Sequence, residues 1–474
     1  MTTGLLRVAL VALYPAPGAK APGGVRTVVQ GIVRGLQAYD DLQIHVIHCH
    51  ADIAASAEVT LGTTDGATLG RTQVHYIAMP KRRLVPNTLA SIPRVEQLLR
   101  QVQPDVVNTH AAHYTIAALR AGFPTVFTIH GVMHREAQVY TSTLFDRTRL
   151  LLEKWLDGYA VRHVRDIVAI SPYILDEYRD RSQARFHRID NPLAPEFFEI
   201  PSLEAALAAT RASLPPSGDT PKKGGTDAER LEYRLLYAGT IDERKNVLDL
   251  LRAVAIVRQQ VPGVRLRVAG RTTSLPYEEK VRHFVAAEGL ASNVDFLGLL
   301  DKEQLLQEYA QCSVAVLASR QETMPMAVIE AMAAAKPVVA TRVGGVPELV
   351  EDGDSGYTVA VGDVDGLARH LVTLLKNAAL RQQMGQRGRQ LAERFRLETV
   401  AAQYRQLYYH VAGRALPSNP IARGAQVTAP TDGSNGQGHE YGGMSTAPLC
   451  DPRATGGTER LHPSGGPHAE RLCD

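Results

Sequence analysis

Short apolar runs of strand length alternate with segments of helical period along most of this 474-residue chain. Helical patterns lie between several of the first runs, at residues 25–38, 92–102 and 147–164. The first expected strands are residues 5–13, 43–48, 74–79, 105–108, 125–128 and 166–170. Because a helix between successive strands makes a crossover connection, this alternation predicts an α/β fold with a parallel, doubly wound sheet.

The same alternation begins again after an interruption. The second set of expected strands is residues 233–237, 265–268, 294–297, 314–317, 338–341 and 357–361. The length of the chain indicates two or three domains. Residues 215–225, rich in Pro, Gly and Ser, have the composition of a loop inserted shortly after a domain boundary near residue 192. We therefore expect one doubly wound domain at residues 1–192 and a second at residues 193–390.

The end of the chain differs from the rest. Residues 391–413 have the apolar period of a last helical stretch. Beyond Pro417 the composition shifts to Gly, Ser, Thr, Pro, Asn and His. Such a segment cannot bury enough apolar surface to offset its chain entropy, so we expect a disordered tail at residues 414–474.

Composition and charge argue against several classes of protein. A net charge of +3, without basic residues interleaved with aromatic ones, does not favour a nucleic-acid partner. The four cysteines have neither metal nor disulfide spacing. The first strand follows the N-terminus without a signal-peptide pattern, and no apolar run approaches about 20 residues. We expect a cytoplasmic protein that does not span a membrane.

Two carboxylates, Glu322 and Glu330, follow the expected strand at residues 314–317. Pro325 between them suits the first position of a helix. Glu322 would then lie on the strand-to-helix loop and Glu330 within the helix, beside the crevice where open α/β sheets bind ligands. The amides of Met326, Ala327 and Val328 would face an anion there. Two acidic residues at this spacing also occur on ordinary solvated helices. Whether these two form a ligand site therefore depends on the motifs around them.

Glycines and cations occupy two other strand-to-helix loops. Gly23 and Gly24 follow the first strand, where glycine lets the backbone approach a ligand. Arg244 and Lys245 follow the strand at residues 233–237, where they can neutralise a diphosphate. Taken alone, the glycines are also typical of a turn and the cations of a solvated surface.

The motifs together resemble a known family. The stronger ones are residues 236–246, 295–298, 318–332, 336–348 and 351–357; the looser ones are residues 22–25, 104–110, 128–131 and 169–172. In this order they resemble retaining nucleotide-sugar glycosyltransferases of the GT-B fold, glycosyltransferase family 4, over roughly residues 5–411. The resemblance implies two Rossmann-like domains facing a cleft, with a C-terminal helix returning to the first. It also implies a hexosyltransferase activity.

The resemblance implies roles for residues of the second domain. Glu330 would accept hydrogen bonds from the ribose hydroxyls of a nucleotide-sugar donor. Glu322 would face the transferred sugar, with the amides of Thr323 and Met324 beside its hydroxyls, and Lys245 would be essential. One departure affects the phosphate site: the family usually has an arginine where this chain has Thr240. Either Arg244 supplies the second cation, or the phosphate is neutralised less strongly here.

The resemblance also implies roles in the first domain. The loop of Gly23 and Gly24 would approach the donor diphosphate. His130 would lie over the donor sugar near the reacting carbon. His110, at the end of the preceding strand, is a second candidate that is equally compatible with an acceptor-side or a structural role.

The expected chemistry needs cations where negative charge develops on the departing phosphate. No Asp-x-Asp motif occurs in a suitable loop, so the basic pair would replace a metal, and we expect neither metal nor cofactor. Retention of the anomeric configuration of the sugar is implied by the resemblance alone. Since no protein nucleophile is assured, we favour front-face attack by the acceptor, with the leaving phosphate as base.

The acceptor and the partners stay open. Residues 81–84 are basic, and residues 147–159 include Trp155; together they would form either a solvated surface or a face that contacts an anionic membrane carrying a lipid-linked acceptor. The alternatives are another GT-B enzyme, namely a nucleotide-sugar epimerase or a phosphorylase, and a non-catalytic nucleotide-binding scaffold. Neither the sugar, the base nor the acceptor follows from the sequence.

Overall fold

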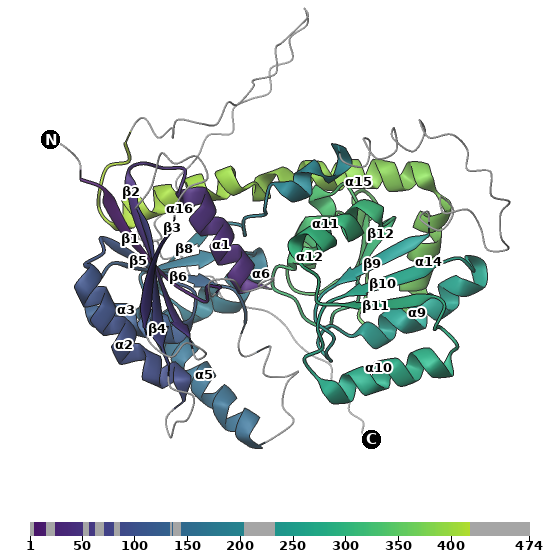
Figure 1. Cartoon of the computed structure of the whole chain (residues 1–474), viewed down its shortest axis with the longest axis horizontal. Helices are drawn as coiled ribbons and strands as arrows, with labels where there is room; N and C mark the ends of the chain where they lie inside the picture. The colour runs from purple at the N-terminus through teal and green to yellow at the C-terminus, as the bar shows by residue number, and fades with distance from the viewer. Residues whose placement is uncertain are drawn as a thin grey trace, which may run out of the picture. The chain divides into compact units, whose positions relative to one another are not determined.

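The computed structural model describes residues 4–15, 24–50, 56–61, 71–79, 86–132, 135, 144–202 and 233–417 (Figure 1). These residues all belong to one compact unit, Met1–Arg423. Four predictions lie outside the described residues, namely the loop position of Gly23, the basic segment 81–84, the inserted loop at residues 215–225 and the tail beyond residue 417.

The first domain is built on an eight-stranded sheet in the order β3-β4-β2-β1-β5-β6-β7-β8. Its strands are β1 (Leu6–Val11), β2 (Leu42–His50), β3 (Ala57–Leu61), β4 (Thr72–Ala78), β5 (Val106–Thr109), β6 (Thr125–Ile129), β7 (Asp166–Ala169) and β8 (Arg185–Arg188). All neighbours are parallel except the edge pair β3 and β4. The strand order reverses between β1 and β5, which places the loops after these two strands at a switch point.

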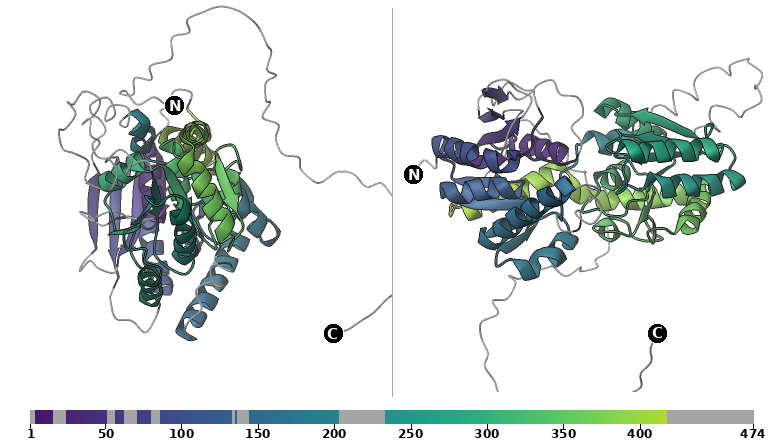
Figure 2. Two further views of the ribbon diagram at one scale, coloured as in Figure 1. Left: turned by 90° about the vertical axis from the view of Figure 1, so that its right-hand side faces the viewer. Right: turned by 90° about the horizontal axis from the view of Figure 1, so that it is seen from below.

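The helices of the first domain cover both faces of its sheet (Figures 1 and 2). They are α1 (Val25–Leu36), α2 (Asn87–Val102), α3 (Ala112–Ala121), α5 (Leu144–His163) and α6 (Pro172–Tyr178). Successive β1 side chains point to opposite faces: Val8 and Leu10 join the core that includes α1, whereas Ala9 and Val11 join the core under α2 and α3. A strand buried on both faces explains why its sequence is a continuous apolar run.

The second domain is built on a six-stranded, fully parallel sheet in the order β11-β10-β9-β12-β13-β14. Its strands are β9 (Arg234–Ala238), β10 (Arg265–Ala269), β11 (Val294–Gly298), β12 (Val314–Leu317), β13 (Val338–Thr341) and β14 (Gly356–Val359). Its helices are α9 (Val247–Gln260), α10 (Leu275–Ala287), α11 (Lys302–Gln311), α12 (Met326–Ala333), α13 (Val346–Leu349), α14 (Val364–Lys376) and α15 (Ala378–Ala392). The strand order reverses between β9 and β12, so the loops after these strands share the second switch point.

The last helix, α16 (Leu397–Val411), packs on the first domain. Tyr408 donates a hydrogen bond to Asn108 Oδ1 at 2.8 Å, and Arg405 forms an ion pair with Asp41 at 2.5 Å. A Cβ atom at Gly35 of α1 would lie 2.7 Å from the Ala401 side chain, so the two helices pack closely because position 35 is glycine. The predicted fold class, two doubly wound domains with a returning C-terminal helix, is confirmed.

Some local expectations were wrong. The edge strands β3 and β8 were not predicted, because their sequences, AEVTL and RFHR, are short and partly polar. Pro325 is the N-cap of α12 rather than its first residue. The last helical stretch is not continuous: α15 ends at Ala392, a 3₁₀ turn covers Glu393–Phe395, and Arg396 has extended backbone before α16 begins.

Candidate functional site

Two cations and a carboxylate meet at the switch point of the second sheet. Lys245 Nζ donates to Glu322 Oε1 at 2.6 Å, and Arg244 Nη1 lies 3.6 Å from Glu322 Oε2. Ser319 Oγ also donates to Glu322 Oε1, at 2.6 Å. Glu322 is only 4% exposed, so these partners stabilise a carboxylate that would be costly to bury alone.

The loop that carries the cations is organised around Asp242. This buried carboxylate accepts hydrogen bonds from Thr240 Oγ1 at 2.7 Å, Lys245 N at 2.9 Å and Thr273 Oγ1 at 3.0 Å. Burial opposes its ionisation, but these hydrogen bonds and the nearby Arg244 guanidinium hold the pKa of Asp242 below its usual value. Thr240, at the position of the family's arginine, therefore binds a loop carboxylate.

A glycine pair fixes the backbone of the carboxylate loop. Gly344 has φ +51°, and a Cβ atom there would lie 1.5 Å from the Glu322 carbonyl oxygen. A Cβ atom at Gly345 would lie 2.2 Å from the Thr323 carbonyl oxygen. Only glycine lets two backbone segments approach this closely. Thr323 and Met324 are consequently buried against this turn rather than open to solvent.

The second carboxylate, Glu330, lies in the second turn of α12 and is held by α11. Tyr309 Oη lies 2.9 Å from Glu330 Oε2 and 3.1 Å from the Ala327 carbonyl oxygen. Burial raises the pKa of Glu330 to about 7, and the hydrogen bond from Tyr309 acts in the opposite direction. Around neutral pH this carboxyl group therefore exists in both protonation states.

One of the three amides expected to face an anion at the start of α12 is not available for this role. Val328 N donates to the Pro325 carbonyl oxygen at 3.1 Å, so this amide is used within the turn. No side chain caps the helix. The amides of Met326 and Ala327 come before the first residue whose amide donates a hydrogen bond within the helix. They therefore remain the candidates for binding an anion.

In the first domain, His110 and His130 lie against each other. They follow the adjacent strands β5 and β6, and His110 Nδ1 is 2.7 Å from His130 Nε2. The ring planes are nearly parallel, at 16°, and the centroids are 5.0 Å apart. Burial and the neighbouring His130 lower the pKa of His110 well below its usual value, and burial lowers the pKa of His130 to about 4. Both rings are therefore neutral at pH 7.

Gly24 lies at the other loop of this switch point, between β1 and α1. It has φ +58° and ψ −128°, a conformation that favours glycine. It is the N-cap of α1, and no side chain caps that helix. A Cβ atom at this position would meet nothing within 4 Å, so the backbone conformation rather than crowding requires glycine here.

The predicted residues thus form two sets, one at a switch point of each sheet. The second-domain set contains Lys245, Arg244 and Glu322, with Glu330 in the second turn of α12. The first-domain set contains Gly24, His110 and His130. Four further residues that the sequence did not single out support them: Ser319, Asp242, Tyr309 and Gly344. For Ser319, Asp242 and Gly344 the sequence signal was their place in the quoted motifs, whereas Tyr309 lies outside those motifs.

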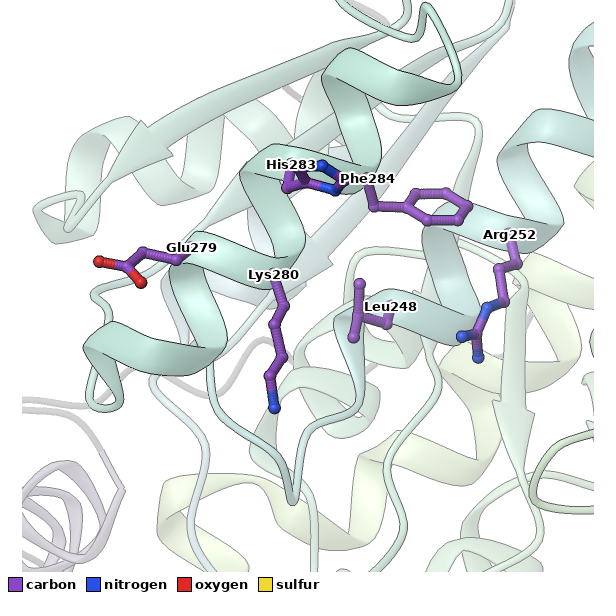
Figure 3. A pocket seen from close by; sticks show the side chains of 6 residues that line it. All are labelled: Leu248, Arg252, Glu279, Lys280, His283 and Phe284. Carbon is purple, nitrogen blue, oxygen red and sulfur yellow. The ribbon is translucent and has the colours of Figure 1, made fainter.

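A separate pocket of about 450 Å³ lies between α9 and α10 (Figure 3). Its lining shares no residue with either set and consists of Leu248, Arg252, Glu279, Lys280, His283 and Phe284. Arg252 forms an ion pair with Asp249 at 2.6 Å. Since open α/β sheets bind ligands at the carboxyl ends of their strands, we place the candidate site at the switch points and not in this pocket.

Both halves of the chain match families of known proteins. The chain matches the family "Glycosyltransferase Family 4" over residues 22–197 and "Glycosyl transferases group 1" over residues 223–391. It is 29% identical to glycogen synthase of Mycobacterium tuberculosis over 316 residues, covering 65% of this chain and 69% of the relative.

Solved structures share the fold. Sucrose-phosphate synthase from Thermosynechococcus elongatus superimposes with a TM-score of 0.69 at 20% identity, over 86% of this chain and 99% of the other. Anabaena Alr3699/HepE in complex with UDP-glucose superimposes with a TM-score of 0.61 at 18% identity, over 85% and 99% of the two chains.

The fold and the matched families define an enzyme class: this chain is a glycosyltransferase of the GT-B fold. Within that class it belongs to glycosyltransferase family 4. The predicted family and enzyme class are confirmed. Every helix in the part of the chain that the structure describes is too short or too polar to span a membrane.

Proposed function

We propose that this enzyme transfers a sugar from a nucleotide-sugar donor to an acceptor hydroxyl, with retention of configuration and without a metal ion. The observation that carries the proposal is the cluster of Lys245, Arg244 and Glu322 at the β9–β12 switch point. Lys245 and Arg244 bring two cations to the loop after β9, and the carboxylates of Glu322 and Asp242 lie beside them. A diphosphate leaving group needs nearby cations, and the UDP-glucose complex of the Anabaena neighbour supports a nucleotide-sugar donor.

Each part of the donor has candidate partners in the second domain. The diphosphate would lie against Lys245, Arg244 and the amides at the start of α12. Glu330 Oε1 would accept from a ribose hydroxyl, because Tyr309 engages only the other oxygen. The transferred sugar would lie near Glu322, whose carboxylate also orients the Lys245 ammonium.

In the first domain, Gly24 would let the backbone approach the diphosphate, and His130 would lie over the donor sugar. Glu322 Oε1 is engaged by both Lys245 and Ser319, which makes it a poor nucleophile. We therefore favour a front-face reaction. The acceptor oxygen bonds to the anomeric carbon on the side from which the phosphate oxygen departs, and the acceptor proton passes to that phosphate.

Nucleotide diphosphates should stabilise the folded protein without added metal. Ligand that binds only the folded state raises stability by RT ln(1 + [L]/Kd), about 2.7 kcal/mol at a concentration 100 times Kd. We expect a higher melting temperature with UDP, GDP or ADP in the presence of EDTA, and the same nucleotide should identify the base of the donor. Stabilisation that requires Mg²⁺ or Mn²⁺ would contradict the role of the basic pair.

Turnover assays separate the rival functions. A transferase consumes nucleotide sugar in proportion to acceptor, whereas an epimerase converts it without acceptor and releases no nucleotide. A phosphorylase would show the absorbance of a pyridoxal aldimine. A scaffold would bind the nucleotide and leave the sugar intact.

We further propose that α5 contacts an anionic membrane surface that carries the acceptor. Leu151 is 67% exposed and Trp155 59% exposed, and they lie four residues apart on one side of the helix. The exposed cation Lys154 lies beside them, whereas Arg149 forms an ion pair with Glu153 at 2.9 Å. Apolar side chains beside cations are typical of helices that bind the membrane interface.

Replacing both Leu151 and Trp155 with Ser should weaken binding to anionic vesicles about tenfold or more, because two large apolar groups no longer enter the interface. Co-sedimentation with phosphatidylglycerol vesicles measures this binding. Leu275→Ser is the matched control, since Leu275 is also exposed but lies on α10. Equal binding by all three proteins would contradict the membrane contact.

A further inference from the structure

The contact between His110 and His130 constrains where their protons lie. A nitrogen–nitrogen distance of 2.7 Å allows one hydrogen between the two rings, so one nitrogen donates and the other accepts. The backbone fixes this pair. His110 N donates to the Val11 carbonyl oxygen at 3.0 Å, and Thr109 Oγ1 lies 2.7 Å from Thr115 Oγ1 on the helix that follows.

The surroundings of His110 select the donor. Its other ring nitrogen, Nε2, is buried and has no hydrogen-bond partner among the described residues. If His110 Nδ1 accepted from His130, the neutral His110 ring would have to carry its hydrogen on Nε2, as a buried N–H without an acceptor. Buried N–H groups without an acceptor are costly, and they are rarer in native structures than under-satisfied carbonyl acceptors. The favoured arrangement is therefore His110 Nδ1–H donating to His130 Nε2.

The tautomer of His130 follows directly. Because its Nε2 accepts the hydrogen bond, the neutral His130 ring carries its own hydrogen on Nδ1. This is the less common tautomer of free neutral histidine. The Nδ1–H is then a hydrogen-bond donor on the side of the ring away from His110.

We propose that His110 is a positioning residue that holds His130 in the Nδ1–H tautomer, so that His130 offers a hydrogen-bond donor to an oxygen of the transferred sugar. This inference rests on the proposed function only for the identity of the bound oxygen, because the tautomer itself depends on the contact between the two rings. His110 thereby has a positioning role in place of the acceptor-side or structural role that the sequence left open. His130 acts as a hydrogen-bond donor and not as a base.

Ring-nitrogen NMR of protein labelled with ¹⁵N-histidine tests the tautomer without any substrate. The signals of His130 are those that disappear in His130→Gln. We expect a protonated Nδ1 and an unprotonated Nε2 for His130 in the wild type. His110→Asn should preserve this pattern, because the amide Nδ2–H of Asn can occupy the place of His110 Nδ1–H. His110→Leu removes the donor, and the His130 signals should move toward the common Nε2–H tautomer.

Turnover should follow the tautomer. For His110→Leu we expect kcat with the nucleotide sugar to fall on the order of 10- to 100-fold, as for other residues that orient a functional imidazole, with KM changed less than threefold. His110→Asn should recover most of kcat. The matched control is His45→Leu. It breaks the other buried histidine pair of the same sheet, His45 Nδ1 to His75 Nε2 at 3.0 Å, and should leave both kcat and the His130 signals unchanged.

The outcomes are distinct. An Nε2–H tautomer of His130 in the wild type, or His130 signals that do not change in a folded His110→Leu, would overturn the inference. Failure of His110→Asn to restore the tautomer lost in His110→Leu would also overturn it. A changed tautomer with unchanged kcat would uphold the positioning role and contradict instead the proposed contact of His130 with the sugar.

Discussion

Replacing Lys245 with Met should lower kcat about 100- to 1000-fold, because it removes the cation proposed to stabilise the departing diphosphate. The nucleotide-sugar turnover at saturating donor and acceptor measures this loss. The matched control is Lys280→Met, which removes a lysine from the pocket between α9 and α10 and should leave kcat within about twofold of the wild type.

A second effect of Lys245→Met must be separated from the first. Glu322 is buried, and without Lys245 it loses the shorter of its two ion pairs, so the variant should also lose stability. The double variant Lys245→Met/Glu322→Gln removes this buried charge and should recover much of the melting temperature. Its turnover should stay low. A double variant with restored turnover would show that Lys245 acts only by neutralising Glu322, and not on the phosphate.

Glu330→Gln should weaken binding of the nucleotide sugar by about 10- to 100-fold at pH 8, as expected for loss of a charged acceptor worth about 1.5–3 kcal/mol. Calorimetric titration measures the affinity. The same substitution should raise the melting temperature of the free protein at pH 8 by a few degrees. Burial makes ionisation of Glu330 costly, and glutamine cannot ionise.

The dependence on pH follows from the raised pKa of Glu330, about 7 against 4.5 for an unperturbed carboxyl. Between these values the folded protein binds more protons than the unfolded chain, so this group makes the protein less stable as pH rises from about 4.5 to about 7. Above about pH 7 the loss of stability caused by Glu330 no longer changes with pH. The difference in melting temperature between Glu330→Gln and the wild type should therefore grow over this interval and then level off.

The affinity for the nucleotide should change with pH in the opposite direction to the stability of the free protein. The ionised carboxylate accepts from ribose hydroxyls better than the protonated form, so affinity should rise with pH up to about 7 and binding should release a proton below it. A nucleotide sugar is the suitable ligand, since it has no terminal phosphate that titrates in this range. Glu330→Gln should show a flat profile between pH 6 and 8. A flat profile in the wild type would contradict the ribose role.

Tyr309 should modulate this titration. Its hydroxyl stabilises the ionised form of Glu330, so its loss in Tyr309→Phe should move the midpoint of the binding profile to higher pH. The direction of that movement distinguishes a hydrogen bond to the carboxylate from a merely steric contact, which would change affinity at every pH alike.

Much of the fold and part of the site could be predicted from the sequence. Strands buried on both faces, such as β1 and β12, are short apolar runs between helical segments, and this pattern depends only on local composition. Glu322, Glu330 and Lys245 could be singled out because their loops have recognisable order and spacing. The edge strands β3 and β8 could not be predicted, since both are short and their sequences are partly polar.

The sequence alone therefore predicts the doubly wound architecture, the glycosyltransferase resemblance and the loops that carry the candidate residues. The pairing of those residues follows only from the three-dimensional fold. Lys245 and Glu322 are 77 positions apart in the chain and meet at 2.6 Å because β9 and β12 are neighbours at a switch point. His110 and His130 meet because β5 and β6 are adjacent, and Tyr309 reaches Glu330 from another helix. Pairing, burial and protonation depend on distances through space, and local sequence does not encode those.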